Sequence, residues 1–130
     1  MPYVVNHIHL KSADPEATAR WFCEAFNMTI TSDEQRVDDR VIRTQTEGGL
    51  TIIISGQRTG ETLGPADDDR HFGLEHFGFD SSDIHADLER LVALGAAVKE
   101  GPVTNAAGGT IAFVSAPGSI RIELVQRPSA

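Results

Sequence analysis

Cysteine, basic residues and long apolar runs are all scarce in this sequence of 130 residues. The single cysteine, Cys23, excludes an internal disulfide and a thiolate metal cage. Lys and Arg total 11 against 19 Asp and Glu, and the net charge of −8 argues against nucleic-acid or anionic-membrane partners, which need clustered cations. No apolar run approaches the ~18 residues of a membrane span, and the first residues lack the pattern of a signal peptide. We therefore expect a cytoplasmic protein with no membrane and no nucleic acid as partner.

The chain contains an internal repeat. Residues 7–14 (HIHLKSAD) align with residues 76–83 (HFGFDSSD) at an offset of 69 residues. Each block starts with histidine, reads as a short strand and ends on an aspartate suited to cap a helix. Apolar residues then recur at spacings of three and four, which predicts a helix over residues 14–26 and another that begins at Ile84. Short runs typical of strands follow each helix, at residues 28–31, 40–44 and 50–55 and again at 97–99, 110–115 and 120–125.

Each half therefore reads as strand, helix and three strands. The sequence predicts an α+β fold of two repeated βαβββ modules in a single domain, residues 1–130. Module 1 covers about 1–56, a linker covers 57–73, and module 2 covers about 74–127. The linker holds an acidic run at residues 67–69, for which we expect a solvated turn. Because one helix covers one face of a sheet, the other, concave face must be covered by the other half or by a second chain.

Three side chains on those concave faces indicate a metal site. Alternation along the strand places His7 opposite the apolar side chains of its strand, and the repeat gives His76 the same place. In the last strand Ile122 and Leu124 pack, so Glu123 faces the other way. A carboxylate near two imidazoles needs a compensating charge, and two histidines with one carboxylate suit a divalent metal with open positions. The residues therefore predict His7, His76 and Glu123 as metal ligands.

Further polar residues lie on the same faces. His9 is a candidate acid–base residue, because imidazole titrates near ~6.5 and the repeat has Gly78 at this place, so the fold does not require a histidine. The alternative is that His9 fills the cavity or binds a carboxylate. Arg121 is expected to pair with Glu123, with an anionic substrate as the alternative. We assign no function to Glu75.

Four stretches carry a resemblance to a known family: residues 7–10 (HIHL), the helix at 14–26, residues 73–79 (GLEHFGF) and residues 116–124 (APGSIRIEL). They resemble the vicinal oxygen chelate superfamily. This group contains glyoxalase I, extradiol dioxygenases, methylmalonyl-CoA epimerase, and the fosfomycin- and bleomycin-resistance proteins. The last stretch departs from the pattern of the family at Ala116, where aspartate is usual.

The resemblance implies the glyoxalase/bleomycin resistance/dioxygenase fold and the same three metal ligands. Glyoxalase I has a further glutamate and the epimerase a glutamine at a fourth position. Here the repeat places Ile54 at that position, and a slip of one residue gives Ile53 or Ser55. Gln57, just after the strand, is the remaining candidate. Since the fourth group moves a proton in glyoxalase chemistry, its absence argues against glyoxalase I activity.

These observations favour a metal-dependent enzyme that acts on a small substrate with two adjacent oxygens. His9 and Glu123 are the expected catalytic residues, and the divalent metal is expected to be Fe(II) or Mn(II), with Ni(II) or Zn(II) as alternatives. A dioxygenase is placed ahead of a glyoxalase- or epimerase-like lyase or isomerase. A metal-free binding protein of the bleomycin-resistance type is the alternative from a different class. The resemblance also implies a homodimer.

Overall fold

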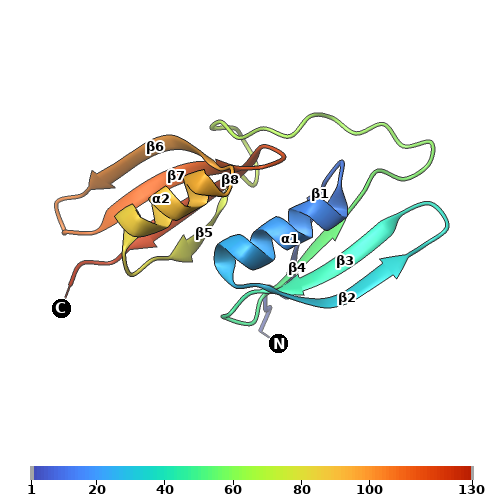
Figure 1. The fold of residues 1–130 in the computed structure, drawn as a ribbon, viewed down its shortest axis with the longest axis horizontal. Helices are drawn as coiled ribbons and strands as arrows, with labels where there is room; N and C mark the ends of the chain where they lie inside the picture. The colour runs from blue at the N-terminus through green and yellow to red at the C-terminus, as the bar shows by residue number, and fades with distance from the viewer. Residues whose placement is uncertain (1, 130) are drawn as a thin grey trace. The chain divides into compact units, whose positions relative to one another are not determined.

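The computed structural model describes residues 2–129, and this part of the chain contains eight strands and two helices. The elements fall into two units, of which the first ends at Gly64 and the second begins at Pro65. Unit 1 contains, in order, β1 (His7–Lys11), α1 (Pro15–Phe26), β2 (Thr29–Gln35), β3 (Arg40–Gln45) and β4 (Thr51–Ser55) (Figure 1). Unit 2 contains β5 (Phe77–Asp80), α2 (Ile84–Ala93), β6 (Ala97–Thr104), β7 (Thr110–Ala116) and β8 (Ile120–Gln126). The predicted α+β fold of two βαβββ modules is confirmed.

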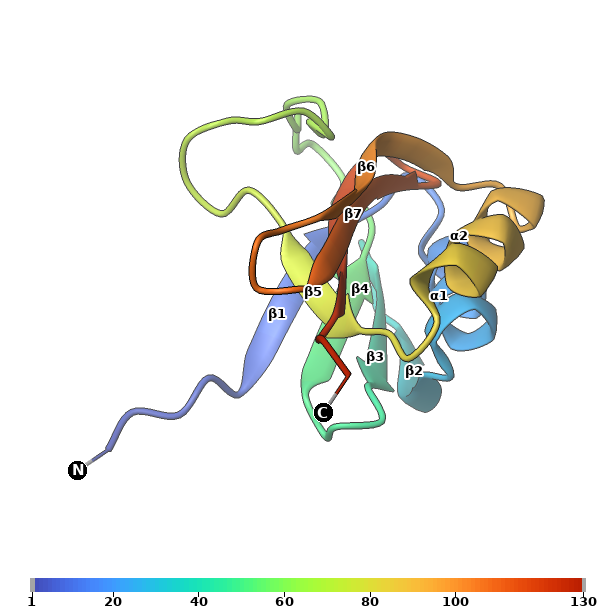
Figure 2. The same cartoon turned by 90° about the vertical axis from the view of Figure 1, so that its left-hand side faces the viewer.

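Both units have the same sheet topology. The strand order is β1-β4-β3-β2 in unit 1 and β5-β8-β7-β6 in unit 2. The first strand of each unit runs parallel to the last one, and the other neighbours are antiparallel. Each helix packs against one face of its own sheet (Figure 2). The opposite face of each sheet therefore carries no helix of its own unit.

The helices begin where the sequence predicts. The Asp14 side chain accepts a hydrogen bond from the backbone N–H of Ala17, and the Asp83 side chain accepts one from Ala86, both at 3.1 Å. These caps satisfy backbone donors that the first turn of a helix leaves unpaired. Neither helix in residues 2–129 is long and apolar enough to cross a membrane.

The core of each unit lies between the helix and the sheet. Burial of the apolar side chains follows the predicted alternation, and the largest of those with no exposed surface are Phe22, Ile42, Ile52, Ile54, Ile84, Leu91 and Ile122. On β1 the side chains of Ile8 and Leu10 are half-buried, whereas His7, His9 and Lys11 are exposed. Packing of the apolar set thus leaves the polar set on the face without a helix.

Candidate metal centre

The clearest cluster of ligand-type side chains lies in unit 2, where His76 and Glu123 meet. The Nε2 atom of His76 is 3.2 Å from Oε2 of Glu123, and both side chains are half-buried. His76 directly precedes β5, and Glu123 is the Cα partner of Gly78 in β8. A side chain at position 78 would meet Glu123, because an added Cβ would lie 3.3 Å from its carbonyl oxygen and 3.5 Å from its Cβ. The glycine therefore keeps the space beside Glu123 clear.

The other ring nitrogen of His76, Nδ1, is hydrogen-bonded to Glu75. This nitrogen lies 2.9 Å from Oε1 of Glu75, and the same carboxylate oxygen accepts a hydrogen bond from Nε of Arg121 at 3.0 Å. The hydrogen bond from His76, together with the hydrogen bond and positive charge of Arg121, lowers the pKa of Glu75 although partial burial opposes the shift. The imidazole ring meets the Phe113 ring edge-on at 4.9 Å between centroids. His76 is thus held by a carboxylate on one side and an aromatic ring on another.

The contact between His76 and Glu123 needs a proton or a cation between the two groups. Because a carboxylate oxygen only accepts hydrogen bonds, Nδ1 of His76 carries the proton of its bond to Glu75. Nε2 of a neutral ring would then direct a lone pair at the oxygen of Glu123. A proton shared between the two groups, or a cation bound by both, removes this repulsion. The pair is therefore a site for a proton or for a metal ion.

The sequence analysis assigns no function to Glu75, and its expected pairing of Arg121 with Glu123 is wrong. Arg121 is buried, and it pairs with Glu75 and Glu100 rather than with Glu123. Alternation predicts opposite directions for Glu75 and His76, but both precede the first residue of β5, so alternation does not govern them. An acidic residue directly before a candidate ligand histidine is the signal that could have identified Glu75.

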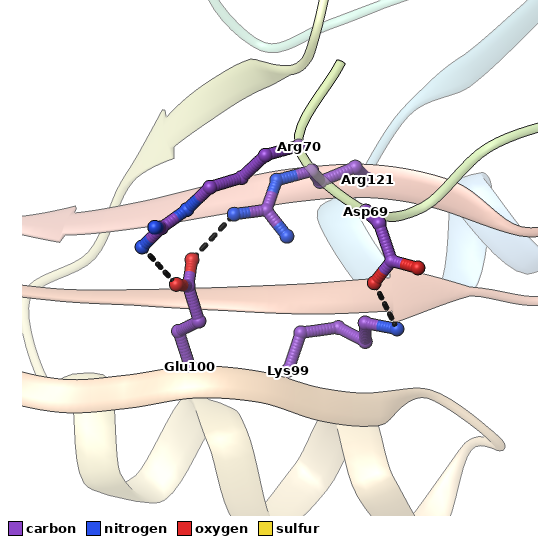
Figure 3. Close-up of a pocket in the computed structure, with 5 residues that line it drawn as sticks. All are labelled: Asp69, Arg70, Lys99, Glu100 and Arg121. Carbon is purple, nitrogen blue, oxygen red and sulfur yellow. Dashed lines mark hydrogen bonds and ion pairs between the residues drawn. The ribbon is translucent and has the colours of Figure 1, made fainter.

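Arg121 also lines a pocket of about 390 Å³ in unit 2, together with Asp69, Arg70, Lys99 and Glu100. Figure 3 shows that Arg70 and Arg121 both point at Glu100, while Lys99 points at Asp69. The guanidinium of Arg121 also lies 4.2 Å from the centre of the Phe113 ring. All five charged side chains therefore have a partner of opposite charge, which indicates a structural ion network.

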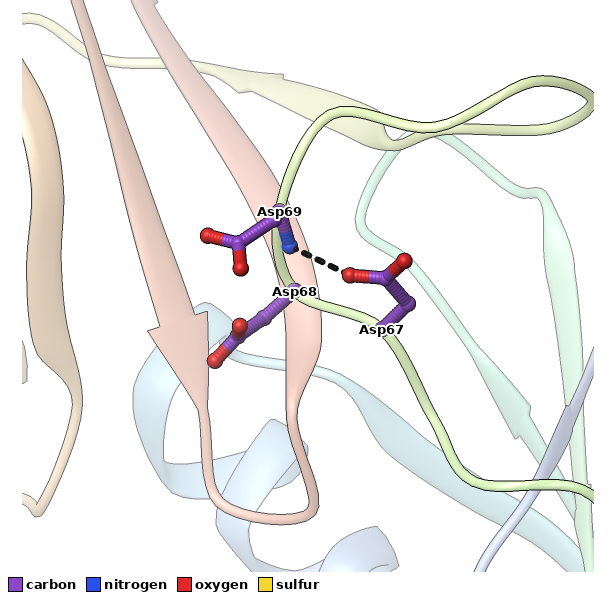
Figure 4. A group of neighbouring side chains, drawn as sticks. All are labelled: Asp67, Asp68 and Asp69. Atoms are coloured by element: carbon purple, nitrogen blue, oxygen red, sulfur yellow. Dashed lines mark hydrogen bonds between the residues drawn. The ribbon is translucent and has the colours of Figure 1, made fainter.

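The acidic run at residues 67–69 forms a bend that is anchored on the sheet of unit 2. Its three carboxylates each have an oxygen within 4.8 Å of the others (Figure 4). Asp68 accepts a hydrogen bond from Ser115 Oγ at 2.6 Å and lies 3.1 Å from Lys99 Nζ, and these contacts lower its pKa. Asp69 donates its backbone N–H to Asp67 at 2.9 Å. The run is therefore not wholly solvated, because Asp68 is bound to the sheet.

In unit 1, His7 and His9 lie two residues apart on β1. His7 is exposed, and its Nδ1 donates to the side-chain oxygen of Asn6. His9 Nε2 is hydrogen-bonded to Ser55 Oγ at 2.7 Å. Partial desolvation lowers the pKa of His9, and the positive charge of Lys11 lowers it further. The neutral, basic form of His9 is therefore favoured.

The strand register identifies the residue of unit 1 that is equivalent to Glu123. His9 has Ile53 as its Cα partner in β4, just as Gly78 has Glu123 in β8. Ile53 is half-buried, whereas Ile54 is fully buried toward the helix. Gln57 follows β4 and is exposed. Of the alternatives from the sequence, the structure thus places Ile53 at the position equivalent to Glu123.

Comparison with solved structures supports the fold. A glyoxalase family protein from Bacillus cereus superimposes with a TM-score of 0.84 at 15% identity, covering 95% of this chain and 93% of that one. A glyoxylase/bleomycin resistance protein/dioxygenase domain from Frankia sp. EAN1pec gives 0.76 at 23% identity, covering 98% and 99%. The fosfomycin resistance protein FosX from Listeria monocytogenes, complexed with Mn(II) and sulfate, gives 0.73 at 19% identity, covering 97% and 93%.

A search of curated proteins found no match to this sequence. The family model of the Glyoxalase/Bleomycin resistance protein/Dioxygenase superfamily, in contrast, matches residues 4–124, which is nearly the whole chain. This match agrees with the structure, in which two repeated modules each form a mixed four-stranded sheet. The chain belongs to the Glyoxalase/Bleomycin resistance protein/Dioxygenase superfamily.

Proposed function

We propose that this protein is a metal-dependent enzyme in which His7, His76 and Glu123 hold one divalent ion. The observation that carries the proposal is the 3.2 Å separation between His76 Nε2 and Glu123 Oε2. Two ligand atoms at about 2.1 Å from one ion and at a right angle to each other are about 3 Å apart. The pair is therefore spaced as two adjacent ligands of one ion would be.

The donor set also fits a particular kind of metal. Two imidazoles and one carboxylate suit Fe(II) or Mn(II) with positions left open, and Ni(II) and Zn(II) are the alternatives. The relative from Listeria monocytogenes is complexed with Mn(II). Its identity of 19% supports the fold only, so the choice of metal rests on the donor set.

When bound, such an ion polarises an oxygen of the substrate and stabilises the negative charge that develops there. We propose a small substrate with two adjacent oxygens. His9 would accept or donate the proton, because its ring lies on the same face of β1 as His7 and its lowered pKa favours the basic form. Glu123 would contribute its carboxylate to both the ion and the reacting centre.

Ile53 supports one reaction class over another. An isomerase or lyase of the glyoxalase type needs a base at the fourth position, and an isoleucine cannot accept a proton there. A dioxygenase has no such requirement. We therefore place a dioxygenase ahead of a lyase or isomerase.

We further propose that the active form is a homodimer. Each sheet of this chain has one face without a helix of its own unit, and a symmetric pair of chains would cover such faces. His7 of one chain would then complete the site of His76 and Glu123 of the other.

A metal-free binding protein is the second candidate. It is favoured by one observation, since His76 with both nitrogens protonated would satisfy Glu75 and Glu123 without any metal. The net charge of −8 would suit a cationic ligand. In that case the protein binds its ligand equally well after treatment with a chelator.

The experiment that tests the proposed function is oxygen uptake by the protein reconstituted anaerobically with Fe(II). Catechols, hydroquinones and hydroxylated acids form the substrate panel. We expect uptake with at least one of these classes, and we expect it to disappear when the metal is removed by chelation. Turnover that persists in the chelated protein would contradict the proposal.

A further inference from the structure

We propose that Glu75, held in place by Arg121, is a positioning residue that makes His76 the stronger of the two histidine ligands. The inference rests on the proposed function, because it concerns the metal site formed by His76. It assigns a role to a residue for which the sequence offered none.

The first step is the tautomer of His76. One oxygen of Glu75 lies 2.9 Å from Nδ1 of His76. Because that oxygen can only accept, the proton of the neutral ring resides on Nδ1 and the lone pair on Nε2. Nε2 faces Glu123, the other proposed ligand in unit 2. Glu75 thus selects the form of the ring that can bind a metal at the correct nitrogen.

The second step is the rigidity of Glu75. Its hydrogen-bonded oxygen also accepts from Nε of Arg121 at 3.0 Å. Arg121 is 4% exposed, and its guanidinium donates through Nη1 to the carbonyl oxygen of Asp68 at 3.1 Å and through Nη2 to Glu100. A guanidinium with three acceptors cannot turn away without losing several charge-assisted hydrogen bonds. Arg121 therefore holds the carboxylate of Glu75 at the ring.

Unit 1 contains a pair of residues that corresponds to Glu75 and His76. At the offset of 69 residues, Glu75 aligns with Asn6, and His76 aligns with His7. Asn6 also accepts a hydrogen bond from Nδ1 of the histidine that follows it. The two units therefore orient their histidines in the same way, but the acceptor is a neutral amide in unit 1 and a carboxylate in unit 2. A carboxylate accepts a stronger, charge-assisted hydrogen bond from the ring N–H than an amide does, so the ring of His76 is held more firmly for metal binding than the ring of His7 and is the stronger ligand of the two.

Titration of the metal-free protein with Mn(II), followed by the electron paramagnetic resonance signal of free Mn(II), tests this inference. Glu75→Gln keeps an acceptor oxygen and removes the charge, and we expect it to weaken Mn(II) binding by about tenfold. Glu75→Ala removes the acceptor as well, and we expect a loss approaching about 100-fold. Glu89→Gln, an exposed glutamate on α2, is the matched control and should bind as the wild type does.

A spectroscopic measurement separates positioning from a general loss of structure. In ¹⁵N-labelled, metal-free protein at pH 8, we expect the His76 ring to be protonated at Nδ1 in the wild type and in Glu75→Gln. In Glu75→Ala the proton should move to Nε2, because the carboxylate of Glu123 is then the acceptor that faces the ring. A ring that remains fully protonated at Nδ1 in Glu75→Ala would overturn the role of Glu75.

The reciprocal variant Asn6→Asp tests the same idea at an exposed position that the fold does not depend on. It gives His7 a carboxylate, and we expect it to tighten Mn(II) binding several-fold. If the Glu75 variants fail to fold, this variant decides, and unchanged affinity would overturn the inference. His76→Ala distinguishes a failure of the proposed metal site from a failure of the role of Glu75. If this variant binds Mn(II) like the wild type, the proposed function is wrong. If it loses Mn(II) while Glu75→Gln and Glu75→Ala do not, only the role of Glu75 is wrong.

Discussion

Ile53 occupies in β4 the position that Glu123 occupies in β8. Each is the Cα partner of the third residue of its repeat block, which is His9 in unit 1 and Gly78 in unit 2. The two units therefore differ at this position, since β8 carries a carboxylate and β4 an apolar side chain.

This difference predicts the absence of glyoxalase activity. The reaction needs a base to move a proton between adjacent carbons, and Ile53 cannot serve. We expect negligible conversion of the glutathione–methylglyoxal hemithioacetal, even with Ni(II) or Zn(II) supplied, as measured by its change in ultraviolet absorbance. Robust turnover would contradict this expectation and would direct attention to Gln57 as the missing base.

His9 is predicted to act on the proton rather than on the metal. His9→Ala should lower turnover by ~10²- to 10⁴-fold, the usual contribution of general acid–base catalysis, while the bound metal remains. His85→Ala, which removes an exposed histidine on α2, serves as the control. Because the pKa of His9 is lowered from 6.5, its basic form persists into more acidic solution, and the acidic limb of kcat/KM should lie below pH 6.5. Loss of metal in His9→Ala would instead make His9 a ligand.

The sequence predicts most elements of the fold because local signals mark them. Asp14 and Asp83 cap the helices as expected. Strands β2 and β6 extend further than predicted, to Gln35 and Thr104, because backbone pairing with β3 and β7 holds polar stretches that carry no apolar alternation.

The site was harder to predict, because it depends on register. The offset of 69 residues holds at the helix caps but becomes 70 in the last strands, since the turn at residues 105–109 is one residue longer than the turn at 36–39. That change moves the fourth position from Ile54 to Ile53. The hydrogen bond between Glu75 and Arg121 joins residues that are far apart in the chain, and no local sequence pattern indicates it.

Asp39 is predicted to stabilise unit 1 in a pH-dependent way. Its side chain is 3% exposed, accepts a hydrogen bond from the Gly56 N–H at 2.9 Å, and lies 3.6 Å from Nζ of Lys11. Burial alone would raise the pKa of Asp39, but these contacts outweigh it and the pKa lies below 3.8. Asp39→Asn should lower the free energy of unfolding by about 1–3 kcal/mol near neutral pH. Asp38→Asn, its exposed neighbour, is the control.

The sign of the pH effect follows from the lowered pKa. The carboxylate stabilises the folded state above pH 3.8, and this contribution is lost as the pH falls through the folded-state pKa below that value. Denaturant unfolding of wild type and Asp39→Asn should therefore differ at pH 7 and converge in strong acid. A difference that stays constant down to pH 2 would contradict the assignment.

The homodimer is tested by complementation between inactive chains. A mixture of His7→Ala and Glu123→Ala chains should recover activity, because each heterodimer would contain one intact site formed by both chains. Recovery should require subunit exchange, which mass spectrometry of labelled chains can follow. An inactive mixture in which exchange has occurred would place the complete site within one chain.

The central claim is that His7, His76 and Glu123 bind one divalent ion together. The most direct measurement is the stoichiometry of Fe(II) and Mn(II) bound to wild type, His7→Ala, His76→Ala and Glu123→Ala, with Asp80→Ala as an exposed acidic control on β5. We predict one ion per chain in the wild type and the control, and no stoichiometric binding in the three ligand variants, because two ligands are too few to compete with water. Unchanged stoichiometry in His76→Ala and Glu123→Ala would contradict the account.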